Sequence, residues 1–306
     1  MPLCRAVPGA QHAMAEPERG HGAARPQMPD NASAPPVPED PDARIRARAP
    51  AHSKGVVVIE HEGRRLVAKF PEPKGRSWPR ALAARQAAAA MASRRLPLAP
   101  FRLPGREARL SLEAERLTTL AEDRIPVPEL VGVTDQYLLM TAGGESLEKV
   151  LKRLPPDSED AGRYVARAAR VLGDMHRRGH WHGAAQVRNV LVDEHGRITL
   201  IDFEEDLSEV PAETRACYDL MLFLASIALG SGSAARQGPR ITLGQRALQA
   251  YEAATDPDLL APLERYHRRL RRLQRLARPI ETWTGRKVRR TLALADILDA
   301  ASYTPS

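Results

Sequence analysis

Aromatic residues and cysteines are scarce in this sequence. Aromatic residues make up 4% of the 306 positions, and the only cysteines are Cys4 and Cys217. Because the two lie far apart and Cys217 falls in an apolar helical pattern, we expect no disulfide and a reducing compartment. Leucine, valine and alanine are plentiful, so the chain can still bury a sizeable core, as one two-lobed domain or two small domains.

Long apolar runs and metal-binding clusters are also missing. No stretch of about 18 apolar residues is present, which excludes a transmembrane helix. The N-terminus of the given sequence lacks the apolar core of a secretory signal, so we expect a cytoplasmic protein. No group of His, Cys and Asp has zinc spacing, and no glycine-rich G-x-G-x-x-G loop precedes the first predicted strands.

The composition changes near residue 50. Residues 1–50 are rich in proline, alanine and glycine and show no apolar periodicity, which predicts a disordered tail. Residues 51–306 are then expected to form the folded domain. The formal net charge is +8, and most of the 46 basic residues are arginines. High alanine, arginine and proline together also fit a GC-rich genome, so the charge alone indicates little about function.

The most informative segment is HGAAQVRNVLVDEHGRITLIDFEED, residues 182–206. It predicts two short strands, Asn189–Asp193 and Ile198–Asp202, joined by a tight turn. A hairpin of this shape holds the Asn189 amide and the Asp202 carboxylate close together at one mouth. These are oxygen ligands that suit Mg²⁺, which usually also takes substrate phosphates.

This segment resembles the catalytic loop and metal-binding segment of protein-kinase-like enzymes, where H-x-D-x-x-x-x-N is followed by a hairpin and D-F-G. His182, Asn189 and Asp202-Phe203 match by spacing. Two positions depart from the pattern: Ala184 stands where the family has its catalytic Asp, and Glu204 stands where it has Gly.

The resemblance implies an α+β fold with two lobes: a small β-rich N-lobe, about residues 51–140, and a mainly helical C-lobe, about 141–306. Only a short segment separates Asp202 from Asp219, too short for the activation segment of an ordinary protein kinase. The spacing therefore favours the compact branches, such as the lipopolysaccharide (Kdo/heptose) kinases and RIO-like kinases. A Glu at position 204 is common in the small-molecule and lipopolysaccharide kinase branches.

The predicted N-lobe contains a candidate phosphate-binding lysine. Strands are expected at Gly55–Glu60 and Arg64–Phe70, and Lys69 in the second resembles the kinase lysine that holds the α- and β-phosphates. A partner Glu must come from a nearby helix, and the predicted helix Ser77–Leu96 has no carboxylate. The next predicted helix, Glu107–Glu122, offers Glu113, with Glu115 as the alternative. The two lie about 200° apart, so only one can face the lysine.

The remaining predicted elements follow the kinase order. Strands Val131–Val133 and Tyr137–Met140 lead into a hinge, and the resemblance implies that adenine contacts the backbone of Met140, Thr141 and Ala142. Helices are expected from Leu147, capped by Ser146, and at Glu159–Arg178 and Ala216–Leu229. Within the last helix, the resemblance implies that Asp219 holds the backbone of the catalytic loop, which His182 organises.

A long arginine-rich helix is predicted at Leu259–Arg278. Leu263, Tyr266, Leu270, Leu273 and Ala277 form one apolar face, and arginines crowd the others. Two interpretations stay open, a solvated helix surface and a contact with an anionic membrane surface, which would make the protein peripheral at the inner membrane face. No stacking aromatics interleave with the arginines, so sequence-specific nucleic-acid binding is not expected.

The resemblance implies ATP and Mg²⁺ as cofactors, with Lys69 and Glu113 on the nucleotide and Asn189 and Asp202 on the metal. Gln186 occupies the position next to the γ-phosphate, where other kinases have Lys or His, and Glu204, Glu205 and Asp206 are candidates to supply a carboxylate. Two functions remain open. One is an atypical ATP-dependent phosphotransferase acting on a lipopolysaccharide sugar or another small-molecule hydroxyl. The other is a pseudokinase that binds Mg-nucleotide and serves as a scaffold or regulator.

Overall fold

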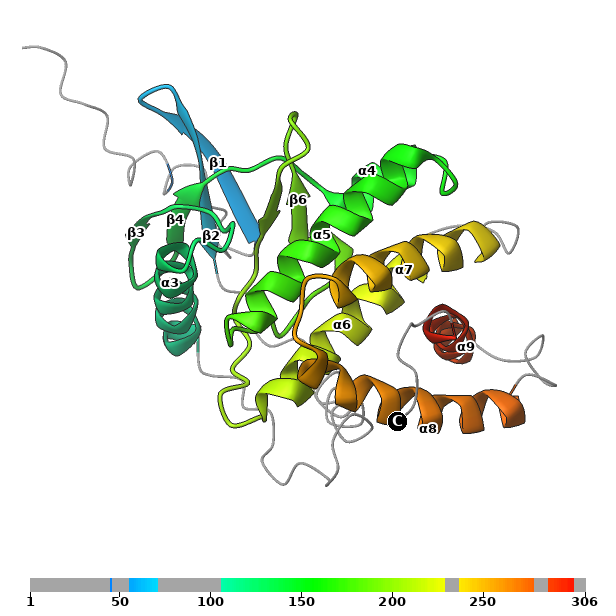
Figure 1. Cartoon of the computed structure of the whole chain (residues 1–306). Coiled ribbons are helices and arrows are strands. Elements are labelled where there is room, and N and C mark those ends of the chain that lie inside the picture. The colour runs from blue at the N-terminus through cyan, green and yellow to red at the C-terminus, as the bar shows by residue number, and fades with distance from the viewer. Residues whose placement is uncertain (1–44, 46–54, 71–105, 229–236, 278–285, 300–306) are drawn as a thin grey trace, which may run out of the picture. The chain divides into compact units, whose positions relative to one another are not determined.

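Strands dominate the N-terminal part of the fold and helices the C-terminal part (Figure 1). The computed structural model describes residue 45 and residues 55–70, 106–228, 237–277 and 286–299, all within the compact unit Asp40–Ser306. The elements named below are β1 Gly55–His61, β2 Arg64–Phe70, α3 Arg106–Glu122, β3 Leu130–Val133, β4 Leu138–Thr141, β5 Glu145–Ser146, α4 Leu147–Arg153, α5 Glu159–Arg177, η1 Val187–Asn189, β6 Val190–Val192, β7 Ile198–Leu200, α6 Ala212–Ala228, α7 Gln237–Glu252, η3 Pro257–Leu260, α8 Ala261–Ala277 and α9 Arg286–Leu298. The predicted α+β class with a β-rich N-lobe and a mainly helical C-lobe is confirmed.

Two predicted regions fall largely outside this description. The predicted helix Ser77–Leu96 lies outside the described residues, and so does the predicted tail, residues 1–50, apart from Ile45. The Ile45 side chain is fully buried and belongs to an apolar cluster with residues of β1 and β2.

The N-terminal sheet is antiparallel with strand order β1-β2-β4-β3. β1 and β2 form a hairpin through a two-residue turn, in which Glu62 and Gly63 have φ of 49° and 71°. Two consecutive left-handed residues are typical of the tight turn that matches strand twist. The predicted strand at Arg64–Phe70 is confirmed at both ends, and β1 runs one residue beyond its predicted end.

The strand register shows which residues lie on each face of this sheet. Val56 pairs with Lys69 and Val58 with Val67, and directly paired residues share one face. Val56 and Val58 are 59% and 39% exposed on the Lys69 face, whereas the other face buries an apolar cluster around Ile59. Lys69 therefore lies beside an exposed apolar strip on the same face of the sheet.

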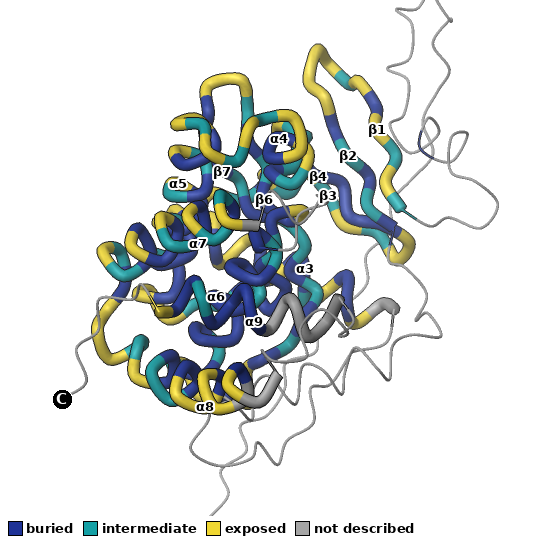
Figure 2. The backbone as a smooth tube through the Cα atoms, turned by 90° about the vertical axis from the view of Figure 1, so that its right-hand side faces the viewer, coloured by how far each residue is buried: buried dark blue, intermediate teal, exposed yellow. Residues whose placement is uncertain are grey.

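Helix α6 forms the centre of the helical lobe, as its nearly all-apolar sequence predicts. It contacts α5, α7, α8 and α9, and it is buried along most of its length (Figure 2). The helix begins at Ala212 and not at the predicted Ala216, because the polar first turn after Pro211 does not continue the apolar run. The predicted helix from Leu259 begins at Ala261, since Pro257–Leu260 form a tight 3-10 turn.

Helices α7 and α9 were not predicted from the sequence. Helix α7 contains Gly238, Pro239 and Gly244, which weaken the local helix signal. The tertiary structure explains Gly244: a Cβ atom there would lie 2.3 Å from Ile297 of α9. Likewise, a Cβ on Gly173 of α5 would lie 3.0 Å from the Tyr251 carbonyl of α7. These helices form because they pack closely against their neighbours.

Candidate active site

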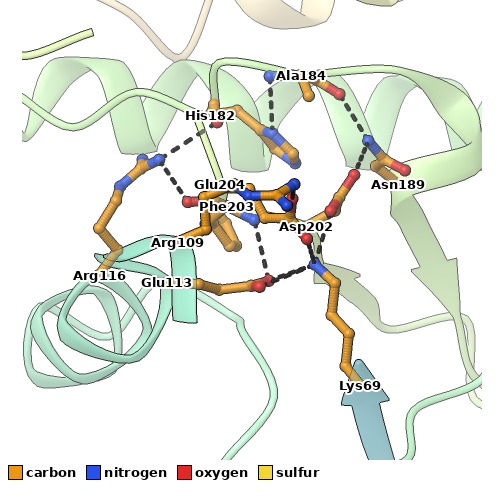
Figure 3. A network of polar contacts seen from close by, with 10 residues as sticks. All are labelled: Lys69, Arg109, Glu113, Arg116, His182, Ala184, Asn189, Asp202, Phe203 and Glu204. Atoms are coloured by element: carbon orange, nitrogen blue, oxygen red, sulfur yellow. Dashed lines mark hydrogen bonds and ion pairs between the residues drawn. The ribbon is translucent and has the colours of Figure 1, made fainter. Parts of the chain in front are cut away.

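Lys69 lies at the centre of a partly buried ionic cluster (Figure 3). Its Nζ lies 2.8 Å from both carboxylate oxygens of Glu113, 2.7 Å from Oδ1 of Asp202 and 2.9 Å from Oε1 of Glu204. The predicted pair with Glu113 therefore forms, and the alternative, Glu115, is exposed on the other side of α3. The role of this pair in nucleotide binding stays a prediction.

Within this cluster, Lys69 and Asp202 each favour the charged form of the other. Burial alone would lower the pKa of Lys69, but the carboxylates of Asp202, Glu113 and Glu204 raise this pKa above its ordinary value. Burial would raise the pKa of Asp202, yet the Lys69 ammonium and its hydrogen bond hold that pKa below the usual range. Lys69 is therefore a cation and Asp202 an anion at neutral pH, as contacts to phosphate and metal require.

Three charged side chains of α3 form one buried stripe. Arg109, Glu113 and Arg116 lie four and then three positions apart, which places them on the same helix face. Arg109 donates to Glu204 at 3.1 Å, and Glu113 Oε1 accepts from the Phe203 amide at 3.2 Å. The sequence analysis missed both arginines. Their signal is the shared spacing with Glu113 on a helix whose other core positions are leucines.

Arg116 fixes the two loops that carry the candidate site. Its guanidinium donates to the backbone carbonyls of Trp181, His182, Phe203 and Glu205. It also lies 4.5 Å from the centre of the Trp181 ring and 5.0 Å from that of Phe203. One buried cation therefore ties the segment before Ala184 to the segment after Asp202.

Asp219 holds the catalytic-loop backbone, as the resemblance implies. Its carboxylate accepts from the amides of His182 at 2.6 Å and Gly183 at 2.8 Å, and it lies 3.3 Å from the His176 ring. The second His176 ring nitrogen meets the Tyr251 hydroxyl at 2.7 Å. Burial would raise the pKa of Asp219, but these hydrogen bonds and charges keep it below its ordinary value. The loop conformation therefore depends on a buried carboxylate.

Asn189 and Asp202 meet at the predicted mouth of the hairpin. Nδ2 of Asn189 donates to the Ala184 carbonyl at 2.9 Å and to Oδ2 of Asp202 at 3.2 Å. Because a carbonyl only accepts, this contact fixes the amide orientation and leaves Oδ1 of Asn189 without a donor among the described residues. Asp202 has φ of 76°, a left-handed conformation that costs roughly 1–3 kcal/mol and is often found at functional sites.

These two residues fit Mg²⁺ through the chemistry of their donors. One carboxylate and one free amide oxygen suit a hard cation that completes its shell with phosphate oxygens and water. Among the described residues, no group of three or more His, Cys, Asp and Glu side chains forms a cage of its own for a metal. The site therefore suits an ion that arrives with a phosphate ligand.

The hinge runs from Thr141 to Gly144 and joins β4 to the short strand β5. The amides of Thr141 and Ala142 already donate to the carbonyls of Glu129 and Arg65. These two residues therefore offer a ligand their carbonyls and not their N–H groups. A cavity of about 960 Å³ borders the hinge, but none of Lys69, Glu113, Asn189 and Asp202 is among the described residues that line it. It is separate from the ionic cluster.

Comparison with known proteins places the chain in a family. The model of the lipopolysaccharide kinase (Kdo/WaaP) family matches residues 54–222, more than half of the chain. The chain belongs to this family. The matched range contains the ionic cluster, the hinge, the predicted catalytic loop and Asp219. All of these features therefore lie within the part of the chain that the family model describes.

The chain was also compared with solved structures and with curated proteins. The solved structure of a MAP kinase from Leishmania major is 12% identical, with 74% of this chain and 71% of that chain covered and a TM-score of 0.33. The comparison with curated proteins gave no match. No helix among the described residues is both long enough and apolar enough to cross a membrane.

In this member of the lipopolysaccharide kinase family, the predicted catalytic loop, residues 182–189, contains no Asp or Glu. Ala184 is buried and contributes its carbonyl to Asn189. Gln186 is half-buried at the start of η1, and its side chain makes no hydrogen bond within the described part of the chain. Of the three candidate carboxylates after Phe203, only Glu204 joins the Lys69 cluster, while that of Asp206 accepts from Ser208.

The buried His182 makes the stability of this family member sensitive to acid. Burial, together with Arg116, lowers the pKa of His182 from 6.5 to about 4, and the ring stacks on Phe203. In the unfolded chain His182 is protonated below about pH 6.5, whereas in the folded chain it is protonated only below about pH 4. Stability is therefore present above pH 6.5 and falls as the pH drops, by up to about 3 kcal/mol from this group.

Denaturant unfolding of wild type and His182→Phe between pH 7.5 and 4 measures this effect. The phenylalanine keeps the ring stack but cannot titrate, so its unfolding free energy should fall less steeply over this window. The comparison rests on the slope with pH, because losing the acceptor for the Ala184 amide lowers stability at every pH. Equal slopes in the two proteins would contradict the assignment.

Proposed function

We propose that this lipopolysaccharide kinase family member is an ATP-dependent phosphotransferase that acts on a hydroxyl of a lipopolysaccharide sugar or of another small molecule. The observation that carries the proposal is the cluster in which Lys69 of β2 joins Glu113 of α3 and Asp202 of the hairpin. These three residues come from three separate parts of the chain, and all three lie within the range that the kinase family model matches. Phosphoryl transfer consists mostly of positioning and charge neutralisation, for which these groups are suited.

The residues have distinct roles in this proposal. Lys69 would contact the phosphates, and Glu113 would hold the lysine in place. Oδ1 of Asn189 and the Asp202 carboxylate would hold Mg²⁺, which neutralises phosphate charge when it is bound. At the hinge, the backbone of Met140, Thr141 and Ala142 would receive the adenine, with the carbonyls of Thr141 and Ala142 as acceptors and the N–H of Gly143 or Gly144 as donor.

The acceptor hydroxyl has no general base at position 184. Loss of a positioned base typically costs about 10²–10⁴-fold in rate and leaves the remaining catalysis intact. The Gln186 side chain, which makes no hydrogen bond to a described residue, would orient the hydroxyl or a phosphate oxygen. We therefore expect slow but measurable transfer from wild type.

Phosphate transfer from labelled ATP to lipopolysaccharide and to isolated core sugars tests the proposal. We expect Mg²⁺-dependent labelling by wild type, and a rise of about 10-fold or more in Ala184→Asp, because the restored carboxylate can accept the hydroxyl proton. An exposed substitution, Asp135→Asn in the β3–β4 turn, serves as the matched control and should change nothing. Absence of labelling from wild type, with every acceptor tried, would count against the proposal.

A pseudokinase is the second candidate, and two observations favour it. Ala184 removes the base, and Glu204 places a third carboxylate on Lys69, which would hinder the contact between this lysine and a phosphate being transferred. In this case wild type would bind Mg-nucleotide without transfer, and Ala184→Asp would create activity that wild type lacks. The same assay therefore separates the two functions.

We also propose that α8 lies against an anionic membrane surface, where a lipid-linked substrate would be found. Its 17 residues include six arginines and one glutamate. Leu263, Tyr266 and Leu270 are buried, so the apolar face is already covered. Much of α8 is exposed (Figure 2). The side chains of Arg268 and Arg271 are 65% and 54% accessible. Each such arginine contributes about 1 kcal/mol of binding free energy near an anionic bilayer.

Sedimentation with lipid vesicles tests this proposal. We expect the protein to sediment with phosphatidylglycerol vesicles at low salt, less at high salt, and not with phosphatidylcholine vesicles.

A further inference from the structure

Glu204 occupies a position on Lys69 that the proposed reaction needs. An ammonium group has three N–H donors. The Lys69 ammonium faces three carboxylates, those of Glu113, Asp202 and Glu204, all within 2.9 Å. Glu113 and Asp202 accept hydrogen bonds from Lys69, and Glu204 forms an ion pair with the same ammonium, so a phosphate oxygen that approaches on the Glu204 side meets a carboxylate already in contact with Lys69.

The three carboxylates are not equally free to leave. Glu113 is 2% exposed, and its Oε1 also accepts from the Phe203 amide, so displacing it would leave a buried amide unpaired. Asp202 is held from the other side by Asn189, and in the proposed function it stays at the site as a metal ligand. Glu204 has neither constraint, so it is the group whose departure costs least.

Arg109 gives Glu204 a second place to stay. The other Glu204 oxygen, Oε2, already accepts from Nη1 of Arg109 at 3.1 Å. The Arg109 side chain is 9% exposed and lies on the α3 stripe with Glu113. Glu204 can thus release Lys69 and keep its partner on α3, which avoids leaving a half-buried carboxylate without a cation.

We propose that Glu204 gates the candidate nucleotide site, holding the Lys69 donor that a phosphate oxygen takes and moving onto Arg109 alone when nucleotide binds. The inference rests on the proposed function, because it assigns regulation to the same site. Repulsion between the Glu204 carboxylate and an arriving phosphate adds to the barrier. The gate sets affinity for nucleotide and takes no part in the chemical step, so Glu204 is a positioning residue.

Binding of Mg-ATP to Glu204→Gln measures the gate. The glutamine keeps the shape but removes the negative charge that pairs with Lys69 and repels phosphate, so we expect the Kd for Mg-ATP to fall about 10-fold, which is about 1.4 kcal/mol. Titration calorimetry of wild type and variant gives the ratio. Melting of both proteins without ligand verifies that the variant is folded.

Arg109→Gln supplies the second arm of a double-mutant cycle. Without its second partner, Glu204 should hold Lys69 more firmly, and Mg-ATP binding should weaken severalfold in the wild-type background. In the Glu204→Gln background the same substitution should have little effect, because the gate is already open. A general structural role of Arg109 would instead weaken binding equally in both backgrounds.

The outcomes separate the gate from the proposed function. If wild type binds Mg-ATP and Glu204→Gln binds no tighter, the gate is overturned and the nucleotide site stands. If Glu204→Gln binds more weakly in the presence of Mg²⁺, Glu204 assists the metal and the gate is likewise overturned. If neither protein binds, the gate and the proposed function fail together. Tighter binding by the variant, with the Arg109 effect confined to the wild-type background, supports the gate.

Discussion

Asp219→Ala should lower the free energy of unfolding by about 3–5 kcal/mol, the largest loss we expect from a single substitution in this chain. The substitution leaves the amides of His182 and Gly183 buried without an acceptor and removes the partner of His176. An unsatisfied buried donor costs about 1–3 kcal/mol, and the substitution leaves two such amides without their acceptor. Because whole domains are stable by only about 5–15 kcal/mol, the melting temperature should drop by roughly 10 °C.

Asp174→Ala is the matched control for this prediction. Asp174 also faces two cations, Arg177 and Arg178, but its side chain is 31% exposed on the surface of α5. Exposed ion pairs contribute about 0–1 kcal/mol, so the control should melt close to wild type. If Asp219→Ala unfolds like Asp174→Ala, the buried carboxylate does not stabilise the catalytic loop, and our account of that loop is wrong.

Asp202→Ala should reduce phosphate transfer by about 10³-fold or more, which abolishes it in practice. The proposed site has one carboxylate for the metal, and a bound metal ion supplies several kcal/mol of charge stabilisation during transfer. The substitution also removes a residue with φ of 76° and the hydrogen bond from Lys69. We expect the variant to remain folded, since Lys69 keeps its pairs with Glu113 and Glu204.

Melting curves detect the same loss without knowledge of the acceptor. A ligand present at about 100 times its Kd stabilises the folded state by about 2.7 kcal/mol, or several degrees for a domain of this size. Wild type should show this rise with Mg-ATP and a smaller one with ATP and chelator. Asp202→Ala should lose the magnesium-dependent part. A full magnesium-dependent rise in the variant would exclude Asp202 as a metal ligand.

The local pattern of the chain predicted the hairpin between Asn189 and Asp202 and the apolar helix around Asp219. Both predictions rest on short-range signals: alternation of apolar residues, turn residues, and a long apolar run with a single acid. Lys69 and Glu113 required more, because local periodicity places each on an element without showing that the elements meet. The kinase resemblance supplied that step, by naming a lysine that needs a glutamate.

Three features depended on the tertiary structure alone. The ion pair from Lys69 to Glu204 and the guanidinium contacts of Arg116 join residues that are far apart in the chain. The spacing of Arg109, Glu113 and Arg116 places them on one helix face, but it does not show which groups that face meets. Helix α7 contains Gly244, whose close approach to α9 outweighs its poor helix propensity.

The sequence by itself determined the hairpin that ends in Asp202, the apolar helix around Asp219 and the absence of an acid at position 184, and its motifs carried the kinase resemblance that implied the class of fold. Residue spacing, apolar periodicity and residue identity along the chain carry that information. Only the tertiary structure decided which carboxylates surround Lys69 and how deeply they are buried. The energy of such a cluster comes from desolvation and from charges brought together from three elements, and these exist only once the chain has folded.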